Sequence, residues 1–161
     1  MAAAPVAAHI NAFLRCFGFD DLKPVSMPMD TQRTLSTAQS PASTNEFAAM
    51  RNVPYREAAG SLMCLALATR PDIAFAVSVV SHFAIRPGME HWEAVKRVFR
   101  YLKGTWELCL TYGAVPGGEK LQGYADADGS MAEDRHAISR YAFMLCAKLV
   151  CACAPLSLLD T

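Results

Sequence analysis

The sequence predicts an α+β protein, with an N-terminal helical subdomain of three to four helices followed by an incomplete antiparallel sheet of about three strands. Up to residue 106 the apolar residues recur at helical spacing, and Pro or Gly marks each break. From residue 107 to residue 145 the apolar period changes to two, which is typical of strands. Apolar residues make up 53% of the 161 residues and charged residues 19%, so the chain can form a core and is not globally disordered.

The N-terminal part predicts one helix and a long connection. Residues 9–19 carry apolar side chains at helical spacing, and Gly18 is a suitable C-terminal stop. Residues 20–52 contain three prolines among many Ser, Thr and Gln residues, as connections do. A connection of this length is unusual inside a compact domain, so we expect it to be either functional or mobile.

Three further helices are predicted in succession. The first covers residues 55–69, and Pro71 then breaks the chain and restarts it. Residues 73–85 are apolar on nearly every face, so the second helix is expected to be buried all round. The third, residues 89–103, is the most amphipathic, and Gly104 is a natural C-terminal cap. Its apolar face is formed by Trp92, Val95, Phe99 and Leu102.

The sheet region alternates apolar and polar residues in three stretches. Strands are predicted at residues 108–112, 121–127 and 137–145, with an extension of the last to Cys153 left open. A Pro- and Gly-containing turn and a polar loop separate them. The predicted organisation is therefore an N-terminal helix (1–19), a connection (20–52), a helical connection subdomain (53–106), a partial sheet (107–145) and a tail (146–161).

Charge gives only local evidence for a nucleic-acid partner, because basic and acidic residues balance at 15 each. The last predicted helix and the turn before it carry five basic residues against two acidic ones. Lys96, Arg100 and Lys103 share one face of that helix, with Arg97 beside them, and could bind phosphates. The alternative is a solvated helix face on which Glu93 and Arg97 form an i, i+4 pair.

One pair of carboxylates is a candidate metal site. Asp126 and Asp128 are two residues apart at a predicted strand end, so both lie on one face and could hold a divalent metal, although acidic residues there are commonly only solvated. A calcium loop of the EF-hand type is excluded, because Met131 and Ala137 occupy the positions that need Gly and Glu. Phosphate loops, nucleophile elbows and metalloprotease His pairs are not found in the sequence.

The cysteines and the apolar segments bear on the environment of the chain. Cys146, Cys151 and Cys153 lie close together, but a structural zinc site needs four ligands, so apolar thiols or a disordered tail are the alternative. No segment has the length of a membrane span, and the N-terminus lacks the basic region of a signal peptide. An intracellular protein is expected, cytoplasmic or nuclear, with no membrane partner.

About sixty residues, 53–112, carry a motif series at fixed spacing that resembles the segment following the polymerase active site in copia-type retrotransposon polyproteins. Cys64 and Cys109 depart from the family, which usually has Tyr and Gly there. The matching residues are Tyr55, Gly60, Ser61, Leu62, Thr69, Arg70, Pro71, Asp72, Ser81, Phe83, Pro87, His91, Lys96, Arg97, Arg100, Tyr101, Leu102, Lys103, Gly104 and Thr105.

The resemblance extends on both sides, over residues 9–145. The stretch FGFDDLKPVSMPMD (17–30) resembles the preceding segment of the family, and GYADAD (123–128) resembles the first strand of its ribonuclease H domain. Residues 146–161 do not resemble the Gly-rich turn and Ser-Trp-Ser-Ser segment with which the family continues. A frameshift, a missed splice site or decay of an old insertion is our hypothesis for this tail.

The resemblance implies a fragment of an RNA-directed DNA polymerase and ribonuclease H polyprotein whose parent family uses Mg²⁺. No pair of aspartates on a hairpin precedes Phe17, and Asp126 matches only the first ribonuclease H carboxylate, the others being expected beyond Thr161. The fragment is therefore expected to need no cofactor and to catalyse nothing alone. The alternatives are a module that binds RNA–DNA hybrids and a non-functional relic. An unpaired strand edge should favour self-association.

Overall fold

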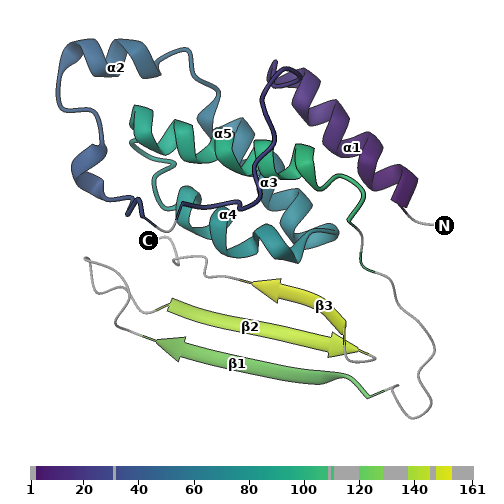
Figure 1. Cartoon of the computed structure of the whole chain (residues 1–161). Coiled ribbons are helices and arrows are strands. Elements are labelled where there is room, and N and C mark those ends of the chain that lie inside the picture. The colour runs from purple at the N-terminus through teal and green to yellow at the C-terminus, as the bar shows by residue number, and fades with distance from the viewer. Residues whose placement is uncertain are drawn as a thin grey trace.

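The computed structural model describes residues 3–30, 32–108, 110, 120–128, 138–145 and 148–153. It confirms the α+β class, because the helices come first in the chain and an antiparallel sheet comes last. Figure 1 shows the helices gathered into one layer, with the sheet beneath them. Among the described helices, none combines the length and apolar character that crossing a bilayer requires.

Helix α1 (Ala3–Cys16) starts earlier and ends earlier than the predicted range 9–19. Gly18 is the stop that the sequence indicated, with a φ of 67° that an L side chain rarely adopts. The N–H of Gly18 donates to the carbonyl of Arg15 (3.1 Å), and the N–H of Phe19 donates to the carbonyl of Leu14 (2.7 Å). This pair of bonds is the Schellman arrangement, which satisfies the last carbonyls of the helix.

The connection contains a helix that the sequence analysis missed. After the short 3₁₀ turn η1 (Thr37–Gln39) comes α2 (Thr44–Met50). The Ser43 hydroxyl accepts a hydrogen bond from the N–H of Glu46 (3.3 Å), and the Glu46 carboxylate accepts one from the N–H of Ser43 (3.2 Å). This capping box is a Ser-x-x-Glu pattern, so the start of α2 was visible in the sequence.

Helices α3 (Tyr55–Ala68), α4 (Ala74–Ser81) and α5 (Met89–Gly104) form the rest of the helical block, with the 3₁₀ turn η2 (Pro71–Ile73) before α4. The prediction that the second of these helices is buried all round is wrong, because α4 ends at Ser81 and Phe75 is 59% exposed. The predicted apolar face of α5 is confirmed as part of the core. The buried core residues come from α1, α3, η2, α4 and α5, together with Phe19, and include Ile10, Leu62, Ile73, Val80, Val95, Phe99 and Leu102.

The sheet has three strands among the described residues, in the order β1 (Gln122–Asp128), β2 (Ile138–Leu145) and β3 (Lys148–Cys153). Both pairings are antiparallel, and the register of β2 with β3 shifts between Phe143 and Met144. In Figure 1, β3 is the strand nearest to the helices and β1 the farthest.

Two strand predictions in this region need correction. The predicted strand at residues 108–112 is wrong at Leu108 and Leu110, which are not in a strand, and Tyr112 lies outside the described residues. The N–H of Leu108 donates to the carbonyl of Thr105 (3.0 Å), so the chain is still turning there after α5. The third strand instead lies in the tail, where residues 148–153 form β3 rather than an extension of β2.

Candidate functional site

The four predicted nucleic-acid-binding residues lie on α5 beside residues 20–39, which we call the strap. The ammonium of Lys103 donates to the carbonyl of Asp20 and to that of Leu22 (3.1 Å). Arg100 Nε donates to the carbonyl of Lys23 (2.7 Å). These partners are neutral, so the cations hold the strap without being neutralised by it.

The other two basic residues of the predicted face form ion pairs. Arg97 Nη1 lies 3.5 Å from the carboxylate of Asp30 in the strap, while Arg97 Nε is buried without a hydrogen-bond partner among the described residues. Lys96 pairs with Glu93 one turn earlier on α5. The predicted alternative, a Glu93–Arg97 pair, is therefore wrong, since each residue has a different partner.

His91, near the start of α5, also contacts the strap. Its side chain is fully buried, its Nδ1 accepts a hydrogen bond from the N–H of Gly88 (2.8 Å), and its Nε2 lies 3.1 Å from the carbonyl of Ser36. Nδ1 must be unprotonated to accept, so Nε2–H is the donor to Ser36. The ring of Phe83 stacks on the imidazole with a centroid distance of 4.0 Å. Burial lowers the pKa of His91, although the Ser36 carbonyl and the charge of Glu90 oppose this.

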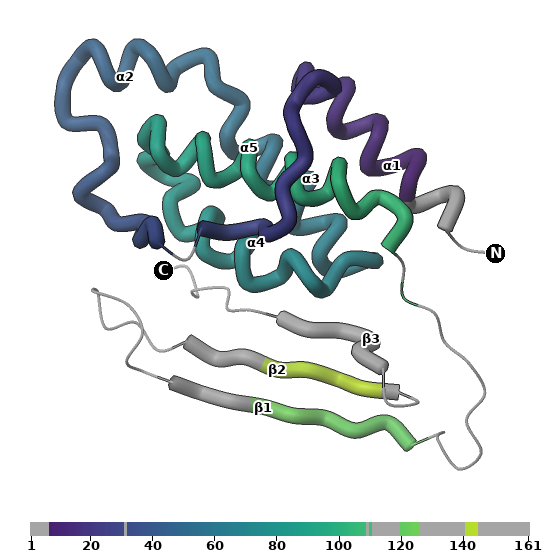
Figure 2. The backbone as a smooth tube through the Cα atoms, in the orientation of Figure 1, coloured from purple at the N-terminus to yellow at the C-terminus, as the bar shows by residue number. Residues whose placement is uncertain are grey.

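The strap therefore runs antiparallel to α5, from its last turn at Lys103 to its first turn at His91. Figure 2 shows this segment passing α5 before it reaches α2. The approach is closest at Gly88, where an added Cβ would lie 1.9 Å from the carbonyl oxygen of Gln39. Gly104, predicted as a cap, is instead the last residue of α5, and an added Cβ there would lie 3.1 Å from Pro24 Cβ.

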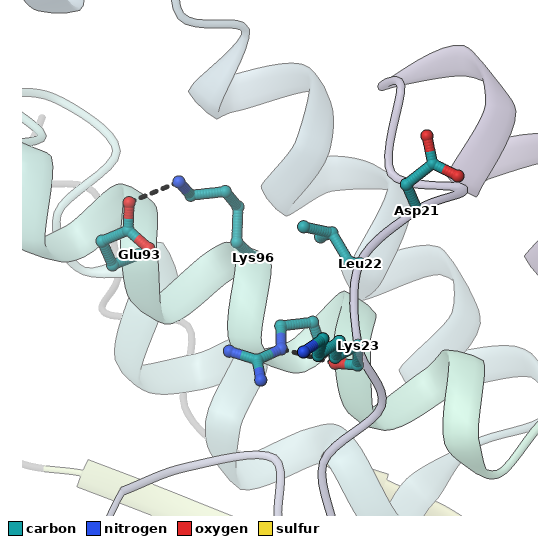
Figure 3. A pocket seen from close by; sticks show the side chains of 6 residues that line it. Asp21, Leu22, Lys23, Glu93 and Lys96 are labelled. Atoms are coloured by element: carbon teal, nitrogen blue, oxygen red, sulfur yellow. Dashed lines mark hydrogen bonds and ion pairs between the residues drawn. The ribbon is translucent and has the colours of Figure 1, made fainter.

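A recess of about 340 Å³ opens between the strap and α5. Figure 3 shows Lys96 and Glu93 joined across one turn of α5, with Leu22 and Lys23 of the strap beside them and the carboxylate of Asp21 pointing away from the pair. Three basic and two acidic side chains line the recess, and Lys96 and Glu93 pair with each other. The lining residues are Asp21, Leu22, Lys23, Glu93, Lys96 and Arg100.

A second polar cluster, which the sequence analysis did not identify, surrounds Arg70. This side chain is 1% exposed. Its guanidinium donates to both carboxylate oxygens of Asp72 (2.9 and 2.8 Å), and to the carbonyl (2.9 Å) and hydroxyl (2.6 Å) of Thr105. The Tyr101 hydroxyl also donates to Asp72 (2.9 Å). The cluster joins the turn before α4 to the C-terminal end of α5, where a cation complements the helix dipole.

The charge of Arg70 stabilises the ionised form of Asp72 in this cluster. Burial alone would raise the pKa of Asp72, but the hydrogen bonds and charge of Arg70, helped by the Tyr101 hydroxyl, outweigh burial and lower it. Four of the five N–H groups of the guanidinium are used in these bonds, and the side chain is buried, so it is poorly placed to bind a ligand. The cluster therefore fixes the relative positions of α4 and α5.

The predicted metal-binding residues lie in β1. Asp126 is opposite Arg140 on β2, and Asp128 is opposite Ile138. The side chains of both aspartates lie outside what the structure describes, as do Cys146 and the side chains of Cys151 and Cys153. Within the part of the chain that is described, no group of three His, Cys, Asp or Glu side chains could hold a metal ion.

Comparison with known proteins gives several clear similarities. The chain is 47% identical over 120 residues, 74% of its length, to the retrovirus-related Pol polyprotein from transposon TNT 1-94 of Nicotiana tabacum. It is 39% identical over 111 residues, 66% of its length, to that from transposon RE2 of Arabidopsis thaliana. It is also 47% identical over 97 residues to the secreted RxLR effector protein 161 of Plasmopara viticola, covering 60% of the chain and 68% of that protein.

These matches differ widely in how much of the relative they cover. The chain spans only 9% of the Nicotiana tabacum polyprotein and 7% of the Arabidopsis thaliana one. No protein-family model and no solved structure matches the chain.

Proposed function

The chain belongs to the family of copia-type retrotransposon Pol polyproteins, and we propose that it is the segment joining the end of the reverse transcriptase to the start of the ribonuclease H domain. The order of the elements supports this, since a helical block is followed by an antiparallel sheet. The first strand, β1, contains the whole GYADAD stretch that resembles the opening strand of such a ribonuclease H. The helical block would then be a connection subdomain.

The observation that carries the proposal is how the helical block uses the polar residues through which it resembles the family. Arg70 is buried and bonds to Asp72 and Thr105, while Tyr101 also bonds to Asp72. The imidazole of His91 is used in holding the strap. Groups that satisfy one another inside a fold position helices, and they do not present themselves to a substrate. The motif is therefore the signature of a scaffold.

We further propose that the segment is catalytically inactive alone. Hydrolysis of an RNA strand by two metal ions needs enough carboxylates to hold both ions about 4 Å apart. In the parent family Mg²⁺ would supply the Lewis acid, and here Asp126 and Asp128 are the residues that would hold it. The register of the sheet places Arg140 opposite Asp126.

A hybrid-cleavage assay tests the proposal. The chain, its Asp126→Asn variant and a matched Asp21→Asn control are incubated with a labelled RNA–DNA hybrid in Mg²⁺ and in Mn²⁺, beside an active ribonuclease H. We expect no cleavage by any of the three proteins. Metal-dependent cleavage that Asp126→Asn abolishes, and Asp21→Asn does not, would overturn inactivity.

A second candidate function is hybrid binding by the helical block. It is favoured by one observation, that Lys103 and Arg100 contact only neutral carbonyls of the strap and so keep their charge. A phosphate backbone bound there should lose affinity steeply with salt, with a log–log slope of about −0.9 per phosphate contacted.

Charge reversal distinguishes this candidate from simple scaffolding. The variant Lys96→Glu/Arg100→Glu/Lys103→Glu should lose at least tenfold in affinity for a labelled hybrid. The control reverses three exposed cations elsewhere, Arg15, Arg51 and Arg56, which keeps the net charge equal. Circular dichroism checks that both variants are folded. The salt dependence of hybrid affinity is also measured for the unmodified chain, where no substitution can disturb the fold. Equal affinities and a flat salt dependence would exclude hybrid binding at this face.

A further inference from the structure

We infer that the strap is an autoinhibitory cover, whose first half (residues 20–30) must leave α5 before a phosphate backbone can bind there. This inference rests on the second candidate function, hybrid binding by the basic face of α5, which consists of Lys96, Arg97, Arg100 and Lys103. It adds a regulation of that face, because the strap and the nucleic acid would compete for the same cations. The contacts, the packing and the anchoring of the strap each support it.

The first observation is that the strap already uses the groups that a phosphate would need. The ammonium of Lys103 donates to two carbonyls of the strap, and Arg100 Nε donates to a third. The guanidinium of Arg97 lies 3.5 Å from the carboxylate of Asp30, and all three basic side chains are half-buried. A phosphate that uses the same N–H groups has to displace the strap. Three of the four cations of the basic face are therefore engaged by the proposed cover.

The second observation is the kind of acceptor that the strap offers. The acceptors for Lys103 and Arg100 are neutral backbone carbonyls, whereas a phosphate oxygen carries negative charge. A cation is attracted more strongly to an ionised acceptor, and the counterions that a phosphate backbone releases favour the exchange further. Arg97 gains less, because it would exchange one anion for another. The strap can therefore hold the basic face closed and still be displaced from it.

The third observation is that the first half of the strap packs loosely on α5. Recesses of about 340 and 250 Å³ lie between the strap and this helix, and Figure 3 shows the larger one. Within residues 20–30, only Leu22 and Met29 pack against the core, and both are half-buried. Lifting this half therefore exposes little apolar surface.

The fourth observation is that the chain is anchored on both sides of the part that would lift. Before it, Phe19 is buried in the core, with its ring centroid 5.2 Å from that of Phe99. After it, the carbonyl of Ser36 lies 3.1 Å from Nε2 of His91. The residues between these anchors can move outward and return while the helical block stays folded, as a cover requires.

A disulfide that locks the strap onto α5 tests the inference. A Cβ added at Gly104 would lie 3.1 Å from Pro24 Cβ, close to the roughly 3.5–4.5 Å of a disulfide, so the double variant Pro24→Cys/Gly104→Cys can form one. Its affinity for a labelled RNA–DNA hybrid is measured at fixed salt, oxidised and then reduced. The oxidised form should bind at least about tenfold more weakly, because the open, binding-competent state is removed. Reduction of the same sample should restore binding.

Two controls accompany the lock. The unmodified chain and the single variant Gly104→Cys, oxidised in the same way, account for the native cysteines and should bind equally in both forms. Hybrid added before oxidation should slow closure of the disulfide in the double variant, since two competitors for one face weaken each other reciprocally.

A pair of methionine substitutions loosens the strap without a disulfide. Met29→Ala removes a side chain that packs against the core, so it should raise hybrid affinity by about two- to tenfold through a larger open fraction. Met27→Ala is the matched control on the same segment, because Met27 is 47% exposed, and it should leave the affinity unchanged.

The outcomes separate the inference from the function on which it rests. Suppose that the unmodified chain binds hybrid, but the locked and reduced forms bind equally, or Met29→Ala binds no more tightly than Met27→Ala. The cover is then refuted and hybrid binding stands. If neither the unmodified chain nor the reduced double variant binds hybrid, hybrid binding and its regulation are both refuted.

Discussion

The helical block and the sheet treat their polar and apolar groups in opposite ways. In the block, Arg70 is almost fully buried with four of its five guanidinium N–H groups bonded, and His91 uses both ring nitrogens inside the fold. In the sheet, Leu121 and Tyr124 are exposed and one edge of β1 has no partner strand among the described residues. The polar groups of the block are bonded inside the fold, whereas the described part of the sheet exposes apolar side chains.

The residues through which the chain resembles its family and the residues that it exposes to solvent are therefore different sets. The residues that resemble the family are mostly those that close the block, so they identify a scaffold. The sheet region instead exposes Leu121 and Tyr124. Substitutions at the buried polar residues of the block should therefore reduce stability more than substitutions at these two exposed positions.

The largest expected effect comes from removing the buried guanidinium. Arg70→Ala removes the cation from Asp72, whose side chain is 34% exposed, and leaves the carbonyl of Thr105 with only the N–H of Leu108 as a donor. Because water reaches the Asp72 carboxylate, the loss should be smaller than for a fully buried pair, about 2–3 kcal/mol. Urea unfolding followed by circular dichroism measures the loss. Arg56→Ala is the matched control, since Arg56 is exposed and makes one hydrogen bond to the carbonyl of Ala84 (2.9 Å). Equal losses in the two variants would show that burial of Arg70 contributes nothing.

Two glycine substitutions should act in opposite directions. Gly88→Ala drives a methyl group into the carbonyl of Gln39 and should cost about 1–3 kcal/mol, because the strap must move away from α5. Gly60→Ala lies within α3, where nothing is within 4 Å of the added methyl, and should stabilise the chain by about 0.5–1 kcal/mol. Thermal unfolding compares them. A neutral Gly88→Ala would mean that the strap does not rest on α5 there.

The hold of His91 on the strap should depend on pH. Its pKa is lowered in the folded chain, so the unfolded chain binds a proton more readily, and stability falls as pH drops below about 6.5, its ordinary value. The amide of Gly88 donates to His91, so its protection factor against hydrogen exchange, which corrects for the intrinsic pH dependence, should fall between pH 7.5 and pH 5. His91→Gln should remove this dependence, and the exposed His82→Gln should keep it. A profile unchanged by His91→Gln would contradict the assignment.

The sequence predicted those parts of the fold that depend on neighbouring residues. The apolar face of α5 and the stop at Gly18 follow from local spacing and conformation, and both were confirmed. α2 was missed although its Ser43–Glu46 capping box is local, because the surrounding Pro and Ser residues favoured a connection. Residues 148–153 were left open as an extension of the preceding strand, and their antiparallel pairing with β2 as a separate strand was not predicted.

The contacts that define the candidate site could not be predicted in the same way. Arg70 and Thr105 are 35 residues apart, and nothing in either segment encodes their meeting. The partners of Arg100 and Lys103 are backbone carbonyls, which every residue carries and no sequence pattern marks. The basic face of α5 was therefore identified correctly as a cluster, but its engagement with the strap appears only in three dimensions.

The smallest effects should come from deleting a tyrosine hydroxyl in each region. Tyr55 is buried and its hydroxyl donates to the carbonyl of Val80 (2.7 Å), which also accepts from the N–H of Phe83, so Tyr55→Phe removes one buried hydrogen bond and should cost about 0.5–1.5 kcal/mol. The hydroxyl of Tyr124 is exposed and lies 3.4 Å from Gln122, so Tyr124→Phe should leave the free energy of unfolding unchanged. Removal of the same hydroxyl group thus tests a buried hydrogen bond in the helical block and an exposed side chain in the sheet. Urea unfolding at a concentration where the chain is monomeric makes the comparison, and a Tyr124→Phe loss as large as that of Tyr55→Phe would mean that the sheet is as closed as the helical block.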